Sequence, residues 1–200
     1  MNDRKQLIIG FIVVIFLWGF IPNTYSQVYG KLNHLRPTGV AGYVYKTTLG
    51  LEAGSIDDFE TFSRSRFFVN LGFFRPRLDG FNMVTYYSEG NDFTVIPRID
   101  RHPFNLRFYG GYGIDFMFFE TEYFIPYIGF DVGGGMELKA TQTGSSEEIG
   151  GYILLGGRAR IGIEKEFNNL SLMLEWNSGI SINDEKGIFL MNEIGLGIKF

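Results

Sequence analysis

Residues 187–200 read GIFLMNEIGLGIKF. In the second half of this stretch, apolar side chains stand at every second position, with glycine or charged residues between them. Because successive side chains of a strand point to opposite faces, this period of two predicts a β-strand with one apolar face. The apolar face carries Ile194, Leu196, Ile198 and Phe200.

The same period of two runs through most of the chain from Val40 onward. Eight segments show it, of which the third is the least regular, and each has one apolar and one polar or small face. These segments predict an all-β protein built as an eight-stranded antiparallel barrel. The predicted strands are Val40–Gly54, Phe62–Phe74, Leu78–Ser88, Asn105–Phe118, Phe124–Thr141, Gly151–Phe167, Leu170–Ile182 and Gly187–Phe200.

Alternation by itself does not say whether the apolar faces point into a core, as in a soluble lipocalin-like barrel, or out into lipid. Two features of composition favour lipid. Glycine recurs on the polar face, for example at Gly129, Gly133 and Gly135, and small residues suit the crowded interior of a narrow barrel. Aromatic residues gather near the predicted strand ends, which is typical of the interfacial girdles of transmembrane barrels. One predicted rim carries Tyr43, Tyr45, Phe73, Phe74, Phe118, Phe119, Phe124, Phe167 and Phe200, and the other carries Phe62, Tyr87, Phe93 and Trp176.

The lengths of the connections give a third argument for a membrane barrel. With both chain ends in the periplasm, the outward loops are residues 55–61, 89–104, 142–150 and 183–186. The inward turns are then residues 75–77, 119–123 and 168–169. Three of the four outward loops are longer than any inward turn, as is usual for transmembrane barrels.

The N-terminal residues have the layout of a secretory signal peptide. Arg4 and Lys5 precede the uncharged apolar run Leu7–Ile21, and small residues stand three and one before Gln27. That run is shorter than the about 20 residues of a spanning helix, although an uncleaved anchor is the alternative. We expect a signal peptide over residues 1–26, a short segment over 27–39 that is a periplasmic tail or a plug, and the barrel over 40–200.

Together these residues resemble the small bacterial outer-membrane β-barrels of the OmpA and OmpX type. The resemblance covers residues 40–200, and the terminal strand ending in Phe200 is its most specific part. It implies a transmembrane barrel in the cell outer membrane of a Gram-negative envelope. It also implies that Ile194, Leu196, Ile198 and Phe200 form the signal read by the barrel assembly machinery. The implied partners are outer-membrane lipid, that machinery and other envelope proteins.

Charged residues of both signs fall on the predicted lumen face. One interpretation is a salt-bridge network that fills the barrel, and the other is a charge-lined constriction for a small polar solute. An eight-stranded barrel is just wide enough for side chains to fill, which favours the network. The candidate lumen residues are Lys46, Arg66, Asp115, Asp131, Arg158, Arg160, Glu175 and Glu193.

No catalytic, cofactor or metal site is expected. The longest loop holds Ser88, Asp92, Asp100 and His102, which match no catalytic spacing, and the chain has two histidines and no cysteine. The net charge of −4 disfavours nucleic acid. The leading hypothesis is a non-enzymatic structural or accessory barrel of an envelope complex. The alternatives are a narrow selective channel and, less favoured, an outer-membrane enzyme that modifies lipid or peptide.

Overall fold

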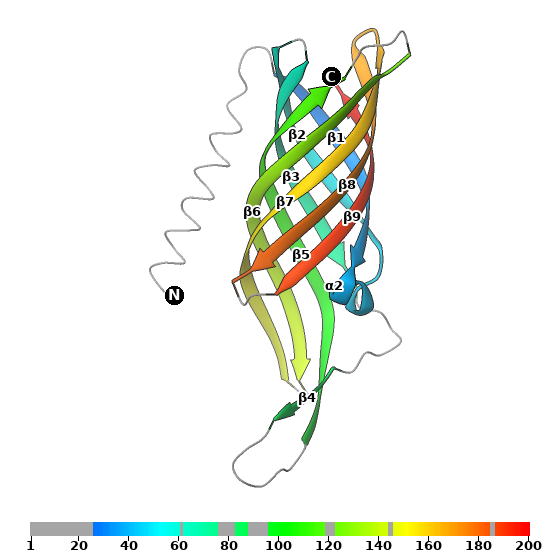
Figure 1. Ribbon diagram of the computed structural model, residues 1–200. Helices are drawn as coiled ribbons and strands as arrows, with labels where there is room; N and C mark the ends of the chain where they lie inside the picture. Colours follow the sequence, from blue (N-terminus) through cyan, green and yellow to red (C-terminus); the bar gives the residue numbers. More distant parts are fainter. Residues whose placement is uncertain are drawn as a thin grey trace.

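The strand-forming segments close into an antiparallel β-barrel in this computed structural model (Figure 1). The structure describes residues 26–60, 62–75, 83–87, 96–118, 123–143, 146–184 and 187–200. Within these ranges it contains nine strands and one short helix. They are β1 (Gln27–Thr38), α2 (Gly39–Val44), β2 (Thr48–Glu60), β3 (Ser63–Phe74), β4 (Met83–Tyr87), β5 (Ile96–Met117), β6 (Ile125–Thr143), β7 (Ser146–Phe167), β8 (Leu170–Asn183) and β9 (Ile188–Lys199).

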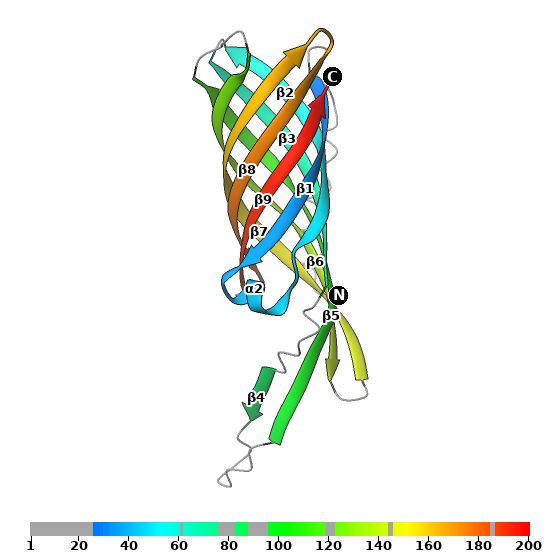
Figure 2. The ribbon, with the colours of Figure 1, turned by 90° about the vertical axis from the view of Figure 1, so that its right-hand side faces the viewer.

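Eight of these strands form the wall of the barrel. Each pairs antiparallel with its neighbours in the order β3-β2-β1-β9-β8-β7-β6-β5, and the pairing of β3 with β5 closes the circle. The strand β4 is not part of the wall, because it pairs only with residues 96–100 at the start of β5. The lower part of Figure 2 shows β4 and the beginning of β5 projecting past the barrel rim. The predicted fold class, an eight-stranded antiparallel barrel, is therefore confirmed.

The prediction missed one wall strand and counted one strand that is not in the wall, so the two errors cancelled in the strand count. Residues 27–38, predicted to be a tail or plug, form the wall strand β1, so the barrel begins at Gln27 rather than Val40. The outward face of β1 carries Gly30, His34 and Arg36. Because these residues are small or polar, β1 lacks the alternation of apolar and polar residues that marks the other strands. Residues 40–47, predicted to begin a strand, instead form most of α2 and its connection to β2. In the segment 78–88 the described residues give only β4.

The two ends of the barrel differ in their connections. The end that carries Phe200 has the short connections between β2 and β3, β5 and β6, and β7 and β8 (Figure 1). The last of these is the predicted tight turn at Asn168-Asn169, with Asn168 in the left-handed region at φ 48°. The opposite end carries α2, the long connection between β3 and β5, and two short connections, between β6 and β7 and between β8 and β9. Because outer-membrane barrels have short periplasmic turns, we refer to the Phe200 end as the inner end and the other as the outer end.

This assignment corrects two of the predicted loops. Residues 55–60, predicted to be an outward loop, belong to β2 and lead to a turn at the inner end. Arg75, predicted to start an inward turn, follows β3 at the outer end. The remaining predicted loops and turns lie at the expected ends, but two outward loops are shorter than predicted, because residues 96–104 belong to β5 and residues 142–143 and 146–150 belong to β6 and β7. Residues 76–77, 89–95, 119–122, 144–145 and 185–186 lie outside the described residues.

The wall has a polar inside and an apolar outside. On β7, Arg160 faces the interior and is 1% exposed, whereas its neighbour Ile161 faces outward and is 55% exposed. The same alternation continues along β8, where Glu175 is buried and Trp176 is exposed. A soluble barrel would have the opposite phase, so the outer surface suits a hydrocarbon solvent.

The aromatic residues of the inner rim form part of a girdle. Their side chains are exposed at the strand ends, and they include Phe62, which was predicted at the other rim. Tyr45 and Phe74, also predicted in a girdle, are instead buried inside the outer end. The exposed inner-rim residues are Phe62, Phe118, Phe124, Phe167 and Phe200.

The predicted signal peptide lies outside the described residues, apart from Ser26. Ser26 donates a hydrogen bond from Oγ to Oδ1 of Asp57 at 2.5 Å, which joins the start of β1 to β2. Cleavage before Gln27 stays a prediction. In the described part of the chain, no helix has the length and apolar character needed to cross a membrane.

Candidate functional site

The interior of the barrel holds an equal number of buried positive and negative side chains. Seven of each sign are buried among the described residues. Charges removed from water are costly unless they are paired and hydrogen-bonded, so their contacts decide what the interior can do. The cations are Lys31, Arg64, Arg66, Arg107, Arg158, Arg160 and Lys199, and the anions are Glu52, Asp115, Asp131, Glu137, Glu164, Glu175 and Glu193.

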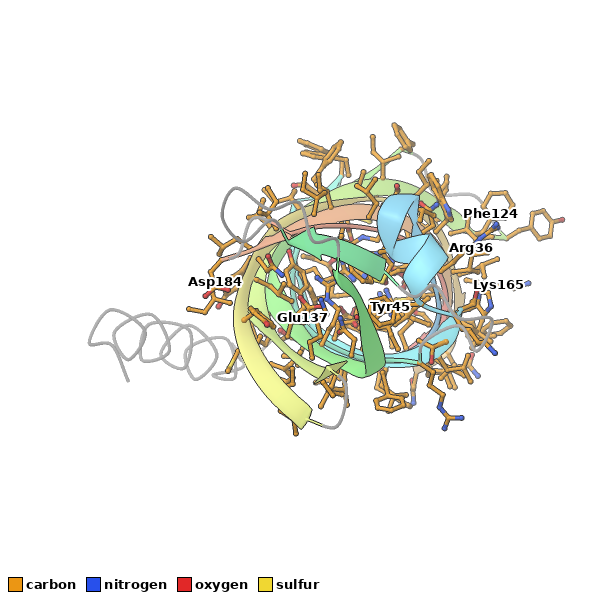
Figure 3. All side chains as sticks on the ribbon, turned by 90° about the horizontal axis from the view of Figure 1, so that it is seen from below. Arg36, Tyr45, Phe124, Glu137, Lys165 and Asp184 are labelled. Carbon is orange, nitrogen blue, oxygen red and sulfur yellow. The ribbon has the colours of Figure 1, made fainter. Side chains whose placement is uncertain are left out.

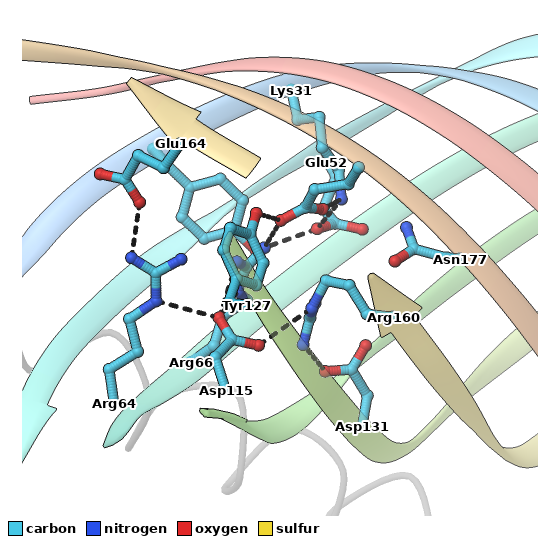
Figure 4. A network of polar contacts seen from close by, with 12 residues as sticks. Lys31, Glu52, Arg64, Arg66, Asp115, Tyr127, Asp131, Arg160, Glu164 and Asn177 are labelled. Carbon is cyan, nitrogen blue, oxygen red and sulfur yellow. Dashed lines mark hydrogen bonds and ion pairs between the residues drawn. The ribbon is translucent and has the colours of Figure 1, made fainter. Parts of the chain in front are cut away.

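Asp115 on β5 is the first centre of the network (Figure 4). Its Oδ2 lies 2.8 Å from the nearer terminal nitrogen of Arg66 and 3.1 Å from Nε of Arg64. Its Oδ1 accepts from Nε of Arg160 at 3.0 Å. Arg64 and Arg66 are two apart on β3, so the strand period points both guanidinium groups inward at this carboxylate.

Glu175 on β8 is the second centre. Its Oε1 accepts from Arg66 at 2.6 Å and from the hydroxyl of Tyr127 at 2.5 Å, and its Oε2 pairs with Nζ of Lys31. Arg66 therefore links Asp115 to Glu175 across the lumen. These contacts join β1, β3, β5, β6 and β8, so the network braces the wall from inside.

Arg158 on β7 is the third centre, and it meets three carboxylates. It lies 2.8 Å from Glu52, 2.9 Å from Asp131 and 3.3 Å from Glu193. Arg160 shares Asp131 with it, at 2.5 Å. Asp131 and Arg158 are register partners on β6 and β7, which explains their contact.

Glycines opposite the network residues make room for it. Gly113 pairs in register with Asp131, and Gly129 pairs with Asp115. A Cβ atom at Gly113 or Gly129 would fall on the Oδ1 atom of its partner aspartate, well inside van der Waals contact. The glycines that the sequence places on the polar face therefore give the larger side chains across the strand their space.

The side chains at the centre of the network have no access to solvent. The side chains of Lys31, Glu52, Arg66, Asp115 and Glu175 are each 0% accessible to solvent. They come from five different wall strands, so they meet across the whole lumen rather than line one side. Nearer the inner end, Glu164 joins Arg64 at 2.6 Å and also pairs with Lys199.

The outer part of the lumen is filled differently. Leu35, Phe74 and Phe189 from three wall strands pack with Ala41 of α2 and with Tyr45, which follows it. In Figure 3, which looks into the outer end, α2 lies over the mouth and Tyr45 lies within the ring of strands. Burial raises the pKa of the Tyr45 phenol to about 12. The helix α2 therefore caps the outer mouth with an apolar cluster.

Between the cap and the network lies a small cavity of about 30 Å³. Arg107 borders it, donates to Oγ of Ser181 at 2.5 Å and stacks its guanidinium 3.9 Å from the ring of Phe189. Among the described residues, no carboxylate lies within ion-pair distance of Arg107. Its register partner Glu137 accepts instead from the amides of Asn105 and Asn183.

The structure brings seven of the eight predicted lumen residues into one network. The exception is Lys46, which is exposed in the connection between α2 and β2 and donates its backbone N–H to the carbonyl of Arg75. The prediction for Lys46 was wrong because residues 39–47 leave the strand wall to form the cap.

Sequence reasoning missed several members of the network. Lys31 was missed because β1 was not recognised as a strand. Arg64 shares the face of Arg66, so the period of two could have found it. Glu52 and Glu164 fall on the polar faces of their predicted strands, but no signal marked them as members of the network.

The residues predicted to form the assembly signal lie together on the outside of β9. Ile194, Leu196, Ile198 and Phe200 are all exposed on the apolar face, and β9 pairs with β1 to close the barrel. Of the loop residues weighed as catalytic, Ser88 and Asp92 lie outside the described residues, and Asp100 and His102 fall within β5. Across the described ranges, no three side chains of the types that bind metals come together.

A closed eight-stranded antiparallel wall with an apolar outside and a polar inside is the architecture of small outer-membrane β-barrels. Comparison with solved structures finds this architecture directly. Neisserial surface protein A (NspA) is 12% identical, with a TM-score of 0.52 over 87% of this chain and 95% of that chain. Ail, the attachment invasion locus protein of Yersinia pestis, is 13% identical, with a TM-score of 0.50 over 88% of this chain and 97% of that chain.

No protein-family model matches the sequence, and no curated protein matches it either. The solved structures are similar in fold rather than in sequence, and they carry no residue roles across to this chain. The fold and the lipid-compatible surface make this protein an integral β-barrel of the outer membrane.

Proposed function

We propose that this protein is a non-enzymatic, non-conducting outer-membrane barrel that acts as a structural or accessory subunit of an envelope assembly. The observation that carries the proposal is the dry charge network. A conducting pore needs a continuous water path, and the side chains of Lys31, Arg66, Asp115 and Glu175 meet across the lumen with no solvent access. The apolar cap under α2 adds a second barrier at the outer mouth.

The outer end supports an interaction role. The strands β5, β6 and β7 are 22, 19 and 22 residues long, whereas β8 and β9 have 14 and 12. The long strands therefore continue beyond the rim, together with β4, as a sheet outside the barrel (Figure 2). Among the described residues, β4 pairs only with β5, and residues 146–152 of β7 pair only with β6. Such sheet edges are surfaces on which an extended segment of another envelope protein can pair.

Conductance in a planar lipid bilayer tests the closed lumen. The wild-type barrel is expected to give little or no current. A matched variant, Arg66→Ala with Glu175→Ala, removes two side chains that meet across the lumen and should conduct in brief openings if it folds. Large, steady currents from the wild type would reject the proposal and favour the narrow selective channel.

Two further measurements test the accessory role. The mass of lipid A from a deletion strain should equal that of the parent, and a change restored by the wild-type gene would point to an enzyme. Purification in mild detergent should recover other envelope proteins with the wild type. A variant that lacks residues 83–87 and 96–100 should no longer recover these envelope proteins, although its barrel stays folded. Equal recovery with this variant would remove the projecting sheet from the proposal.

A further inference from the structure

A row of three polar side chains crosses the lipid-facing surface of β8, β9 and β1. In the strand register, Asn192 on β9 lies opposite Ser178 on β8 and opposite Arg36 on β1. Arg36 is exposed, and Asn192 and Ser178 are partly exposed. Figure 3 places Arg36 on the outside of the barrel. Within the described part of the chain, the structure gives these three side chains no hydrogen bond or ion pair.

On β8 and β9, apolar residues flank this polar row on both sides, whereas on β1 the outward neighbours of Arg36 are His34 and Thr38. One step toward the inner end, Ile194 and Trp176 are 55% and 44% exposed. One step toward the outer end, Leu190 and Ile180 are 39% and 47% exposed. On β8 and β9 the row therefore interrupts an apolar surface, and on β1 it is continuous with the polar residues on either side of Arg36.

The position of Asn192 along β9 also places it within the apolar band of the barrel. A strand that rises about 3.3 Å per residue and tilts by about 40° climbs about 2.5 Å per residue along the barrel axis. The apolar band of such barrels is about 25 Å tall, which corresponds to about ten residues. Counted from Phe200 in the inner girdle, ten residues reach Leu190, so Asn192 lies inside the band. Polar groups in hydrocarbon are costly unless a partner satisfies them.

We propose that this face of β8, β9 and β1 is the docking surface for a second copy of the chain. A two-fold axis along the membrane normal beside Asn192 would place the two Asn192 amides against each other. Each amide can both donate and accept, so the pair is self-complementary. The same axis puts β1 of one copy opposite β8 of the other, which brings each Arg36 within reach of the partner's Ser178 hydroxyl.

The composition of the row favours a second copy over a lipid headgroup. A phosphate would suit Arg36 but would leave the Asn192 amide and the Ser178 hydroxyl to be satisfied separately. Phosphates also lie at the edges of the hydrocarbon, whereas on β9 and β8 the apolar side chains of Leu190 and Ile180 lie between Asn192 or Ser178 and the outer edge. A symmetric pair supplies both donors and acceptors at the depth of the row.

Cysteine cross-linking in native membranes tests the proposed axis. The chain has no cysteine of its own, so Asn192→Cys introduces a single thiol at the position where two copies meet. The matched control is Ile114→Cys on β5, which faces lipid four strands away. Mild oxidation should convert folded Asn192→Cys into a disulfide-linked dimer and leave Ile114→Cys monomeric. Equal yields from the two variants, or no dimer from either, would overturn the proposal.

A second measurement does not depend on cross-linking. The dimer dissociation constant in detergent micelles, from sedimentation equilibrium, should rise about tenfold in Asn192→Leu because one interchain polar pair is lost. Ile114→Leu should leave it unchanged. Asn192→Leu should also make the single barrel no less stable, since it makes the lipid-facing surface more apolar. A wild type that stays monomeric, with bound phosphate that Arg36→Leu abolishes, would replace the second copy by a lipid.

Discussion

The middle and the outer end of the lumen are both closed, but they are closed by different chemistry. In the middle, Arg66 and Arg158 cross-link carboxylates from several wall strands. At the outer end, Tyr45 and Ala41 fold inward and pack on Phe74 and Phe189. The middle is thus closed by residues of the wall itself, and the outer end by a connection that the wall holds in place.

This difference in chemistry determines how the stability of each region should respond to a mutation. Buried charges depend on one another, so removing one leaves its partners unpaired in a low-dielectric interior. An apolar cluster loses only the burial of the group that is removed. We therefore expect damage in the middle to spread across the barrel and damage at the outer end to stay local.

The largest effect is expected for Arg158→Ala. Among the described residues, Arg158 is the only cation that pairs with Glu193, whose other contacts are the amides of Asn33 and Asn177. Breaking a buried pair costs about 3–5 kcal/mol, because the surviving charge keeps its desolvation penalty. Urea unfolding from lipid vesicles should show this loss.

The double variant Arg158→Ala with Glu193→Ala should recover part of that stability. The control cycle joins Arg160 on β7 to Glu175 on the neighbouring strand β8. Arg160 contacts Asp115 and Asp131 instead, so this second cycle should show the smaller coupling energy. Equal coupling in the two cycles would mean that the network does not act through its direct contacts.

The next largest effect is expected when a charge is introduced at the height of Arg160 but on the lipid-facing side of the wall. Ile161 follows Arg160 and faces lipid, six residues above the inner-rim Phe167. Ile161→Arg should cost about 2–4 kcal/mol, the usual cost of arginine near the bilayer middle. Leu155→Arg, six residues further out on the same face, should cost about 0–1 kcal/mol. Equal unfolding energies for the two variants would contradict the assigned depth of β7.

Tyr45→Ser tests whether the cap is a local unit. The loss of one buried aromatic side chain should cost about 1.5–3 kcal/mol. Hydrogen exchange should speed up in residues 39–47 and stay slow in the wall strands next to the network. Uniformly faster exchange throughout the barrel would show that the cap and the network form one cooperative unit.

The smallest effects come from glycines of the two regions. Gly129→Ala places a Cβ atom against Asp115 and should cost about 1–3 kcal/mol through overpacking. Gly39 begins α2 with φ 58°, so Gly39→Ala should cost about 1 kcal/mol in backbone strain. Gly30→Ala is the control, because its Cβ atom would meet nothing within 4 Å. Thermal unfolding of the three variants should follow that order.

The sequence predicted the wall better than it predicted the cap. From β5 to β9, each strand buries one face and exposes the other to lipid, so the period of two is strong and the phase follows from it. On β1 that rule fails, because His34 and Arg36 face outward and Leu35 faces inward. The segment 39–47 alternates in sequence, but its inward packing depends on contacts with β1, β3 and β9 that no local pattern reveals.

The sequence predicts which charged side chains face the lumen, but it does not predict which of them pair with one another. Strand phase alone places Arg158, Arg160, Asp131 and Glu175 inside the barrel. Which charges meet depends on the tilt and stagger of the strands, which shift the height of each residue around the wall. That is why Arg160 contacts Asp115 two strands away rather than Glu175 on the neighbouring strand.

The most direct test of the closed lumen is the reactivity of a thiol placed in the middle of it. Asn177 is 0% exposed beside Glu193, and Lys165 is exposed near the inner end. With purified, folded barrel in micelles, a small charged thiol reagent should modify Lys165→Cys at once. The same reagent should modify Asn177→Cys only after the barrel is unfolded in urea. Rapid modification of folded Asn177→Cys would show that water fills the middle of the lumen, and the account of a dry, closed barrel would be wrong.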